Sequence, residues 1–415
     1  MAYRPADPQR ADGVCPVVDT DYRLPRPAFW HYESLNELRE QAPFVWNTVP
    51  QGFWMLSRYE QVRDALQRPE LFSNDILSPL GDPDARTRLL PQHLNGDEHR
   101  MYRHVLNPWF SPGSVQRVEP LARDRCRALL DELALRGRCD LANEFGLIFP
   151  TEIFLGLLGL PVEDGQLLLP WVEAMFRGFF GGDPDETAKV VAEIEAYYDA
   201  AITDRETNPS DVATDFISHL MNSELDGRPL PREIIVTLCL TLMLAGLDTT
   251  RSALGYIFHH LARHPEDRAR IAADPTVIAP AVEEFLRLYG LIIQDGRAVI
   301  EDVEFHGCPM RAGDIVWLGL AAADRDPRQF DRPDEFVLGR HPNRHLAFGA
   351  GAHRCLGAHL ARMELAMVLE EWLVRIPDFR LDTEDELTER GGQLMLLSVP
   401  LAWDVPAGSA VPGER

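Results

Sequence analysis

The feature that most constrains the fold of this chain is a long apolar segment bounded by two prolines. Pro231 is placed as in the first turn of a helix, and Pro265 ends the helical pattern after His264. About 32 residues lie between them, which as a helix would be roughly 48 Å long. The centre of the segment, residues 238–247, is apolar on nearly every side. We therefore predict a buried helix that crosses the whole protein.

Polar residues interrupt the centre of this predicted helix. Gly246, Asp248, Thr249 and Thr250 follow directly on the apolar stretch. Burying a carboxylate and two hydroxyls costs free energy unless they find partners or have chemical work to do. One interpretation is a kink whose hydroxyls bond the carbonyls of the preceding turn. The interpretation that we favour is a functional site.

The rest of the chain is predicted to be mainly α-helical, with small β-sheets at its periphery. Apolar residues at helical spacing dominate from about residue 98 to residue 290. Helices are predicted at 59–66, 118–135, 150–158, 185–204 and 360–376, a hairpin at 44–57, and strands at 299–305, 315–320 and 394–399. Residues 1–25 are predicted to be a loose N-terminal lead-in, and residues 26–415 a single domain.

Composition excludes several classes of partner. The chain has 65 acidic and 41 basic residues, a formal charge of -24, and such a surface repels nucleic acid and anionic membranes. The longest apolar run, about 14 residues, is shorter than a membrane span, and the N-terminus lacks the apolar region of a signal peptide. The six cysteines are scattered, which suits a reducing compartment. We expect a cytoplasmic monomer without nucleic-acid or membrane partners.

One of these cysteines lies in a glycine-rich loop. Three glycines occur between Phe348 and Gly357, and the helical pattern of residues 360–376 follows at once. A cysteine at the start of a helix lies at the positive end of the helix dipole, where a thiolate is stabilised. The glycines leave room for a flat group to approach the backbone. Cys355 is therefore predicted to be a metal ligand, and the other five cysteines to be inert.

This loop resembles the heme-binding loop of the cytochrome P450 superfamily. Its pattern FxxGxHxCxG is matched at every fixed position by residues 348–357. Other segments look like soluble bacterial members, including camphor-hydroxylase-like ones. The resemblance implies the cytochrome P450 fold, with the long central helix over a buried heme b. It also implies that Cys355 is the axial ligand of the heme iron and that Phe348, Gly349, His353 and Gly357 contact the cofactor.

The long helix carries a second family pattern, (A/G)Gx(D/E)T. It is matched by Ala245, Gly246, Asp248 and Thr249. The resemblance places this stretch over the oxygen-binding face of the heme, with Ala245 and Gly246 at the cofactor. It gives Thr249 the role of steadying dioxygen and a water, and Asp248 that of passing protons inward. Cleavage of dioxygen consumes two protons, so the chemistry needs such a pair.

A third pattern, ExxR, is matched by Glu284 and Arg287. The spacing i, i+3 places both charges on one face of a helix, where they can pair. Taken alone, the pattern is more typical of a solvated surface pair. The resemblance implies instead a buried structural network that these two residues form with Arg340.

The resemblance also implies a group of residues that bind the heme propionates. His99 and Arg103 lie one helical turn apart, and further candidates are Arg297, His345 and His353. Two carboxylates that enter an acidic protein require such a cluster, because charge-assisted bonds to arginine are strong.

The implied activity is a monooxygenase reaction. One oxygen atom of dioxygen enters a C–H or C=C bond of a small-to-medium apolar substrate such as a terpenoid, lipid, aromatic or natural-product precursor. The implied electron donors are a ferredoxin and its reductase, which would dock near Arg354 and Arg362. The predicted substrate pocket is lined by Thr241, Leu244, Ile292, Ile293 and Met395, under a lid at residues 168–182. Between Arg287 and Arg297 the chain is one residue longer than in camphor-hydroxylase-like members, so substrate contacts do not transfer there.

Two alternatives remain open at this point. A heme-thiolate enzyme could use peroxide, or catalyse a coupling or C–C cleavage. A protein of a different class, a heme-based sensor or binding protein, would keep Cys355 and the propionate cluster. Neither the peroxide-driven enzyme nor the sensor has need of Asp248 and Thr249, which favours the monooxygenase.

Overall fold

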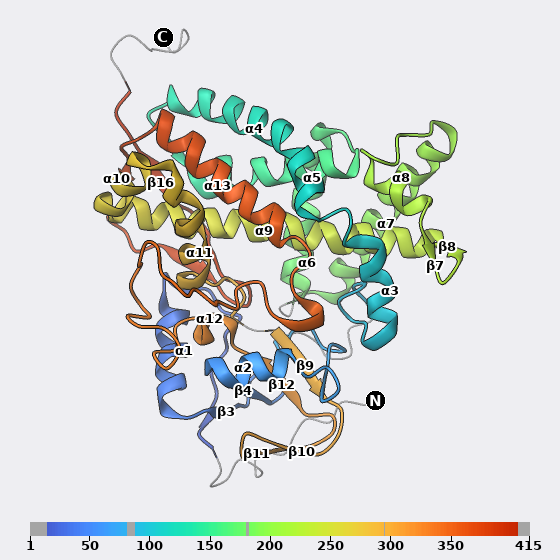
Figure 1. Ribbon diagram of the computed structural model, residues 1–415, viewed down its shortest axis with the longest axis vertical. Helices are drawn as coiled ribbons and strands as arrows, with labels where there is room; N and C mark the ends of the chain where they lie inside the picture. Colours follow the sequence, from blue (N-terminus) through green and yellow to red (C-terminus); the bar gives the residue numbers. More distant parts are fainter. Residues whose placement is uncertain (1–14, 81–87, 180–181, 294, 406–415) are drawn as a thin grey trace.

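The computed structural model describes residues 15–80, 88–179, 182–293 and 295–405, and it is mainly helical (Figure 1). Its helices are α1 (Trp30–Gln41), α2 (Tyr59–Leu66), α3 (Gly96–Leu106), α4 (Pro112–Ala134), α5 (Ile148–Leu158), α6 (Gly165–Phe179), α7 (Pro184–Thr207), α8 (Phe216–Met221), α9 (Arg232–Arg263), α10 (Pro265–Ala273), α11 (Ile278–Leu288), α12 (Leu320–Ala323) and α13 (Ala358–Arg375). Shorter helical turns are η2 (Leu141–Phe145), η3 (Val162–Asp164), η4 (Pro275–Val277) and η5 (Gly351–His353). The predicted fold class is confirmed.

The largest sheet has six strands in the order β1-β3-β4-β12-β9-β5. They are β1 (Val17–Val18), β3 (Phe44–Asn47), β4 (Phe53–Leu56), β12 (Ile315–Leu318), β9 (Asp295–Val299) and β5 (Phe72–Ser73). The smaller sheets contain β2 (Arg26–Pro27), β6 (Arg138–Asp140), β7 (Glu224–Leu225), β8 (Arg228–Pro229), β10 (Val303–Phe305), β11 (Cys308–Met310), β13 (Arg380–Leu381), β14 (Thr388–Arg390), β15 (Met395–Leu396) and β16 (Pro400–Ala402). The hairpin of β3 and β4 is confirmed, with Phe44 opposite Leu56.

The central helix α9 has the predicted bounds and crosses the molecule from one side to the other (Figure 1). Helices α5, α6, α7, α8 and α13 all pack against it. By length and composition alone, α9 and the segment Leu141–Leu158 could each cross a membrane, but most of each apolar window is buried inside the protein. Both therefore have the surroundings of core helices.

Three hydrophobic clusters surround α9 and the sheet. The first joins the carboxyl half of α9 to α4, α11 and α13. The second joins the amino half of α9 to α5, α6, α7 and α8. The third joins residues of the six-stranded sheet, such as Trp54 and Val316, to α2. The middle turns of α9, which carry the polar residues, thus lie where the first two clusters meet.

Two predictions about elements are wrong in part. Residues 15–25 are not a loose lead-in, because β1 pairs with β3 and Tyr22 is fully buried. The Tyr22 ring packs edge-on against Trp317 with centroids 4.9 Å apart, which fixes this segment on the core. Residues 1–14 lie outside the described part of the chain. The strand predicted at 299–305 is two elements, because the chain turns between β9 and β10.

Candidate active site

The cysteine loop lies between the β-rich part of the molecule and the start of α13. Gly351 has φ +70°, and a Cβ at this position would lie 2.5 Å from the carbonyl oxygen of Leu66, so only glycine fits there. The N–H of Cys355 donates to the carbonyl of Phe348 at 2.9 Å. The N–H of Gly357 hydrogen-bonds to the Cys355 sulfur. The loop therefore holds the sulfur at the amino end of α13.

Opposing effects act on the Cys355 thiol. Burial raises its pKa above the usual value of a thiol, and the Gly357 N–H and the charges of Arg103, Arg354 and Arg362 only partly oppose this rise. The residue nevertheless keeps accessible surface, although protein surrounds it on most sides. A sulfur that is enclosed yet reachable, among three arginines, is suited to bind a cation as its thiolate.

Open space adjoins the cysteine loop. A Cβ added at Gly349 or at Gly357 would meet no described atom within 4 Å. On α9, Ala245 is exposed and Gly246 and Thr249 are half-buried, although most of this helix is buried. These two accessible stretches are the ones that the sequence analysis assigned to opposite faces of a heme.

Four of the five predicted propionate ligands lie together. The rings of His99 on α3 and His353 in the cysteine loop are 3.9 Å apart between centroids. Arg103 and Arg297 are close enough to His353 to act on its charge. Burial and neighbouring cations lower the pKa of His99 to about 4 and that of His353 to about 3.

This cluster has more basic groups than acidic ones. Arg297 pairs with Asp295 at 2.7 Å, but the described residues provide no acidic partner for Arg103, and its pKa is lowered by burial. The pocket lowers the pKa of two histidines and holds an arginine with no acidic partner among the described residues. Such a pocket is suited to bind an anion. The open space, the thiolate position and this cationic cluster together fit heme b with its two propionates.

The fifth predicted ligand, His345, does not join the cluster. Its Nε2 lies 3.0 Å from Glu283 Oε2, and its Nδ1 lies 3.3 Å from the N–H of Ala347. Both ring nitrogens are therefore engaged, so the prediction of a propionate contact is not supported. Burial opposes ionisation of Glu283, but hydrogen bonds from Arg362 and His345 lower its pKa to about 2.

Arg362, which was predicted to help in partner docking, is part of this same network. Its Nε and Nη2 donate to the two carboxylate oxygens of Glu283, at 2.5 and 2.9 Å, and the guanidinium lies over the Phe348 ring at 4.4 Å. Arg362 therefore stabilises the cysteine loop through its contact with Phe348. Arg354, in contrast, is exposed and has no ion pair within the described ranges.

The structure brings the two ExxR residues and Arg340 together in one network. Glu284 and Arg287 are fully buried and form a bidentate pair at 2.8 and 2.9 Å. Arg340 donates from Nε to both Glu284 oxygens at 3.0 Å. Asn343, which the sequence analysis missed, adds a bond to Glu284 at 3.2 Å. Because every charge here has a partner, burial of the network is tolerated.

Asp248 on α9 is buried and has two partners, one from β14 and one from the turn that follows it. It forms an ion pair with Arg390 and accepts a hydrogen bond from Gln393 Nε2 at 2.9 Å. The Arg390 guanidinium also lies 5.0 Å from the ring centroid of Phe176 on α6. Asp248 is therefore connected to α6, which overlaps the predicted lid.

The two threonines that follow Asp248 point to different partners. The Thr249 hydroxyl donates to the Ala245 carbonyl at 3.0 Å, which is the local bond foreseen by the kink interpretation. The Thr250 hydroxyl donates to Glu364 on α13 at 3.0 Å. Complete burial raises the pKa of Glu364 to about 8, so this carboxyl group is protonated at neutral pH. A second buried acid thus bonds to the residue next to Thr249, and the sequence analysis did not identify it.

The predicted pocket residues are not gathered into one described cavity. Thr241 and Leu244 are buried on α9, Ile293 lies in the first hydrophobic cluster, Ile292 packs against the third, and Met395 is buried in β15. A hollow of about 450 Å³ opens beside these α9 residues, between α3, α7 and α9. Its apolar lining comes from Leu90, Tyr102, Val191, Ile234 and Leu240.

Of the predicted lid, Trp171, Met175 and Phe176 are buried in the second cluster. They therefore pack as core residues of this cluster. Residues 180–181 lie outside the described ranges.

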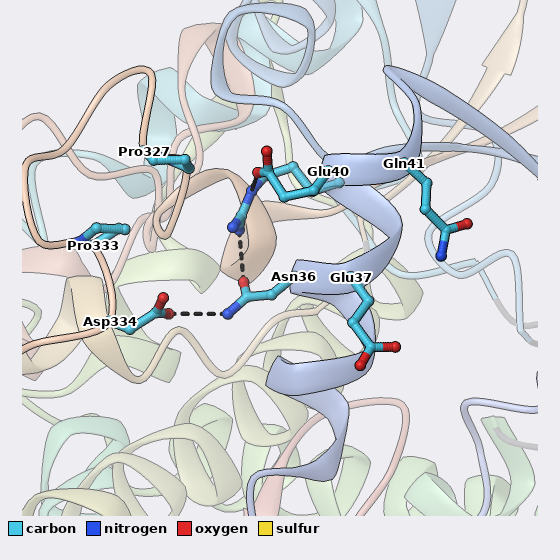
Figure 2. A pocket seen from close by; sticks show the side chains of 8 residues that line it. Asn36, Glu37, Glu40, Gln41, Pro327, Pro333 and Asp334 are labelled. Atoms are coloured by element: carbon cyan, nitrogen blue, oxygen red, sulfur yellow. Dashed lines mark hydrogen bonds and ion pairs between the residues drawn. The ribbon is translucent and has the colours of Figure 1, made fainter.

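A larger hollow, of about 600 Å³, lies beside α1 and has no connection with these residues (Figure 2). Asn36 there accepts from Arg39 at 2.6 Å and donates to Asp334 at 2.9 Å. Its polar side chains are thus bound to one another, as in a structural contact.

Comparisons with known proteins agree with this geometry. The family model described as Cytochrome P450 matches residues 162–403. The methyl-branched lipid omega-hydroxylase of Mycobacterium tuberculosis (strain ATCC 25618 / H37Rv) is 33% identical over 411 residues, covering 91% of this chain and 94% of that protein. The steroid C26-monooxygenase of the same strain is 31% identical over 342 residues, covering 81% and 84%. The crystal structure of CYP101J2 superposes with a TM-score of 0.86 at 32% identity, covering 96% of this chain and all of that one.

Proposed function

The chain belongs to the cytochrome P450 family, whose members use heme b and include the monooxygenases named above, and from this premise we propose a substrate class, site roles and redox partners. The substrate is a small-to-medium apolar molecule that receives the oxygen at a C–H or C=C bond. The observation that carries the proposal is the sulfur of Cys355, held at the amino end of α13 beside open space and a cationic cluster.

Heme b, when bound, supplies the redox chemistry that activates dioxygen with two electrons and transfers one oxygen atom. Cys355 would hold the iron as its thiolate, and the Gly357 N–H would stabilise the charge on the sulfur. Phe348, supported by Arg362, fixes the loop. His99, Arg103, Arg297 and His353 neutralise the two propionates.

Protons reach the reacting oxygen through residues on α9. Thr249 exchanges its local bond to the Ala245 carbonyl for one to dioxygen or a water. Asp248 passes protons toward Thr249, and Arg390 pairs with the buried carboxylate and holds it in place. An enzyme driven by peroxide has no need of this route, so the pair favours dioxygen as the oxidant.

The proposed substrate is apolar because Leu244 and Leu247 lie beside the accessible Ala245 on α9. Relatives named for methyl-branched lipids and steroids support this class. The hollow between α3, α7 and α9 lies beside Leu240, and we propose it as the route of entry. A ligand screen that follows the Soret band of the ferric protein tests the class, because a binder that displaces the water on iron shifts the band. Straight-chain lipids, steroids, terpenoids and small aromatics form its four arms, and no shift with any of them would exclude an apolar substrate.

We also propose that the single domain acts as a cytoplasmic monomer that receives electrons from a ferredoxin and its reductase. All six cysteines are described and none is paired, which fits a reducing compartment. Docking is assigned to the cysteine side, where Arg354 is exposed and unpaired among the described residues. Arg354→Glu should lower the rate of the first electron transfer about tenfold at low salt, and less at high salt. The exposed Arg380→Glu is the control, and an unchanged rate in Arg354→Glu would remove this docking site.

The decisive experiment concerns Cys355. The native protein, reduced and treated with carbon monoxide, should show the red-shifted Soret band of thiolate ligation. Cys355→His should show the band of an imidazole-ligated heme and lose monooxygenase turnover, whereas Cys15→Ser should behave as the native protein. A Cys355→His protein that kept the native spectrum and turnover would falsify the assignment.

A further inference from the structure

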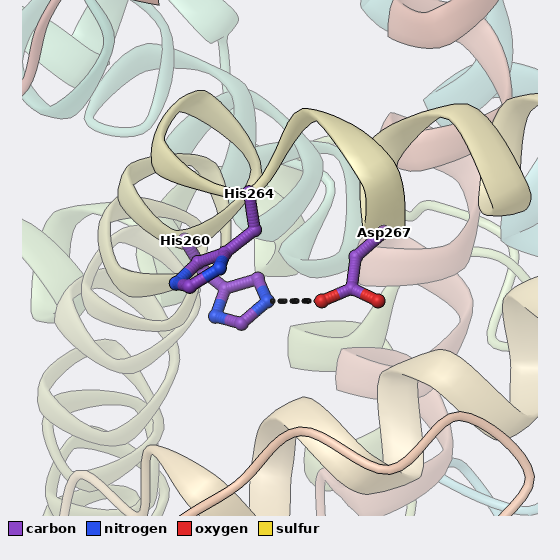
Figure 3. Close-up of side chains that lie close together, drawn as sticks. All are labelled: His260, His264 and Asp267. Atoms are coloured by element: carbon purple, nitrogen blue, oxygen red, sulfur yellow. Dashed lines mark hydrogen bonds and ion pairs between the residues drawn. The ribbon is translucent and has the colours of Figure 1, made fainter.

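A second group of metal-binding side chains lies at the carboxyl end of α9, away from the cysteine loop. His260 and His264 are one helical turn apart, and Asp267 follows in the first turn of α10 (Figure 3). The possible ligand atoms of these three residues all lie within 4.8 Å of one another. No step of the proposed oxygenation uses them. Their role must be sought in the geometry of the cluster itself.

His260 and Asp267 already have the separation of two zinc ligands. His260 Nε2 and Asp267 Oδ2 are 3.2 Å apart. Two ligands bound tetrahedrally at about 2.1 Å from zinc lie about 3.4 Å from each other. A metal ion can therefore replace the hydrogen bond between them with little movement. Figure 3 shows this pair in line with each other.

His260 has the outer contact that metal-bound histidines usually have. Its Nδ1 lies 2.7 Å from the hydroxyl of Tyr289, at the end of α11. With a metal on Nε2, Nδ1 carries the proton and donates it to the Tyr289 oxygen, which fixes the tautomer and the ring.

The other two ligands give access and charge. His264 is about half exposed and stacks on His260 with ring centroids 4.3 Å apart. It must turn one nitrogen toward Asp267 to complete the site. The nearest cation, Arg270, contacts only Asp267 Oδ1, at 3.4 Å, which leaves Oδ2 for the metal.

We propose that His260, His264 and Asp267 bind one zinc ion, with water as the fourth ligand. Two imidazoles and a carboxylate are ligands that zinc accepts in a tetrahedral site. The ion joins the ends of α9 and α10 and, through Tyr289, the end of α11. It therefore stabilises the fold on the side of α9 remote from Thr249. This inference does not depend on the proposed substrate or redox partner.

The test is zinc binding by the full-length, heme-loaded protein, measured by titration calorimetry and by metal content after dialysis. We expect one zinc ion per chain with a Kd of about 1 μM or lower, and a higher Tm with zinc than with a chelator. His264→Ala and Asp267→Asn should weaken binding about tenfold or more, while the exposed His104→Ala leaves it unchanged. The Soret band should stay constant throughout, which separates this site from the heme.

A crystal grown with zinc supplies an independent measurement. Anomalous scattering at the zinc edge should place the ion between His260 Nε2 and Asp267 Oδ2, with the His264 ring turned from its stacked position. The proposal is overturned if zinc does not bind stoichiometrically, if it binds equally well to His264→Ala and Asp267→Asn, or if the anomalous peak lies elsewhere.

Discussion

Burial of the Asp248 carboxylate costs free energy, although we propose that this residue has a function in the proton route. A carboxylate in the middle of an apolar helix loses its hydration, and a paired cation recovers part of that free energy. Arg390 and Gln393 provide this compensation from a strand and a turn more than 140 positions later in the chain. Because Arg390 also contacts Phe176, the state of Asp248 is coupled to the position of α6. Arg390 is thus a positioning residue in the proposed proton route.

We predict that Asp248→Asn lowers coupled turnover about 100-fold, within the range of general acid–base effects. Arg390→Gln should raise the share of electrons lost without product and enlarge the solvent isotope effect, and Arg390→Lys should partly restore both. The measurements are product formed per electron pair consumed, and turnover in H2O and D2O. The exposed Arg380→Gln serves as the control. Native coupling and isotope effect in Arg390→Gln would reduce Arg390 to a structural role.

At the scale of elements, the cationic cluster is assembled from three separate parts of the chain. His99 and Arg103 come from α3, Arg297 from β9, and His353 from the turn η5. The position of β9 is fixed in the sheet by pairing of Arg297 with Val316. Each element has its own reason to form, and the cluster exists only because all three end at the same place. Its strength as an anion site therefore depends on the packing of helix, sheet and loop.

Arg103→Gln should release heme about tenfold faster than the native protein, because a charge-assisted bond contributes about 1.5–3 kcal/mol. The rate is measured by transfer of heme to apomyoglobin. Arg100→Gln is a matched control on the same helix, since Arg100 is exposed and pairs with Asp97. Equal heme loss from both variants would contradict the assignment of Arg103 to a propionate.

At the scale of the whole molecule, different buried carboxyl groups change the stability of the fold in opposite directions as the pH rises. Burial raises the pKa of Asp324 to about 7 and that of Glu364 to about 8. For Glu283 burial acts the same way, but hydrogen bonds outweigh it and lower the pKa to about 2. The folded state therefore retains protons on the first two groups in neutral solution, and releases the proton of the third even in acid.

These shifts predict how stability varies with pH. Between about pH 4 and pH 8 the unfolded chain has lost the protons that Asp324 and Glu364 keep, so stability falls as pH rises through this window. Asp324→Asn and Glu364→Gln should each recover about 2 to 4 kcal/mol at pH 8 and almost nothing at pH 4. Glu283 acts in the opposite direction, and its contribution is lost only below about pH 4.5.

Unfolding of heme-loaded protein by denaturant between pH 4 and pH 9 measures this effect. The exposed Glu384→Gln should follow the native curve at every pH. Parallel curves for the native protein and for both buried-acid variants would show that these carboxyl groups do not carry the pH dependence.

The sequence by itself determined the features that depend on short spacings. The span of α9 follows from two prolines and an unbroken apolar pattern, and the Glu284–Arg287 pair follows from i, i+3 geometry. The cysteine loop was recognisable because its glycines, histidine and cysteine act as one contiguous unit. Local backbone geometry converts such spacings directly into structure, so no knowledge of distant residues was needed.

The tertiary structure alone decided which distant side chains meet. Histidine is a residue type that can bind a propionate, but the ring of His345 is bound instead by Glu283, 62 positions earlier. Arg390 reaches Asp248 and Tyr22 reaches the core through contacts that no local pattern records. Such pairings depend on how complete elements pack, because the free energy of burying a charge or a ring is set by every neighbour at once.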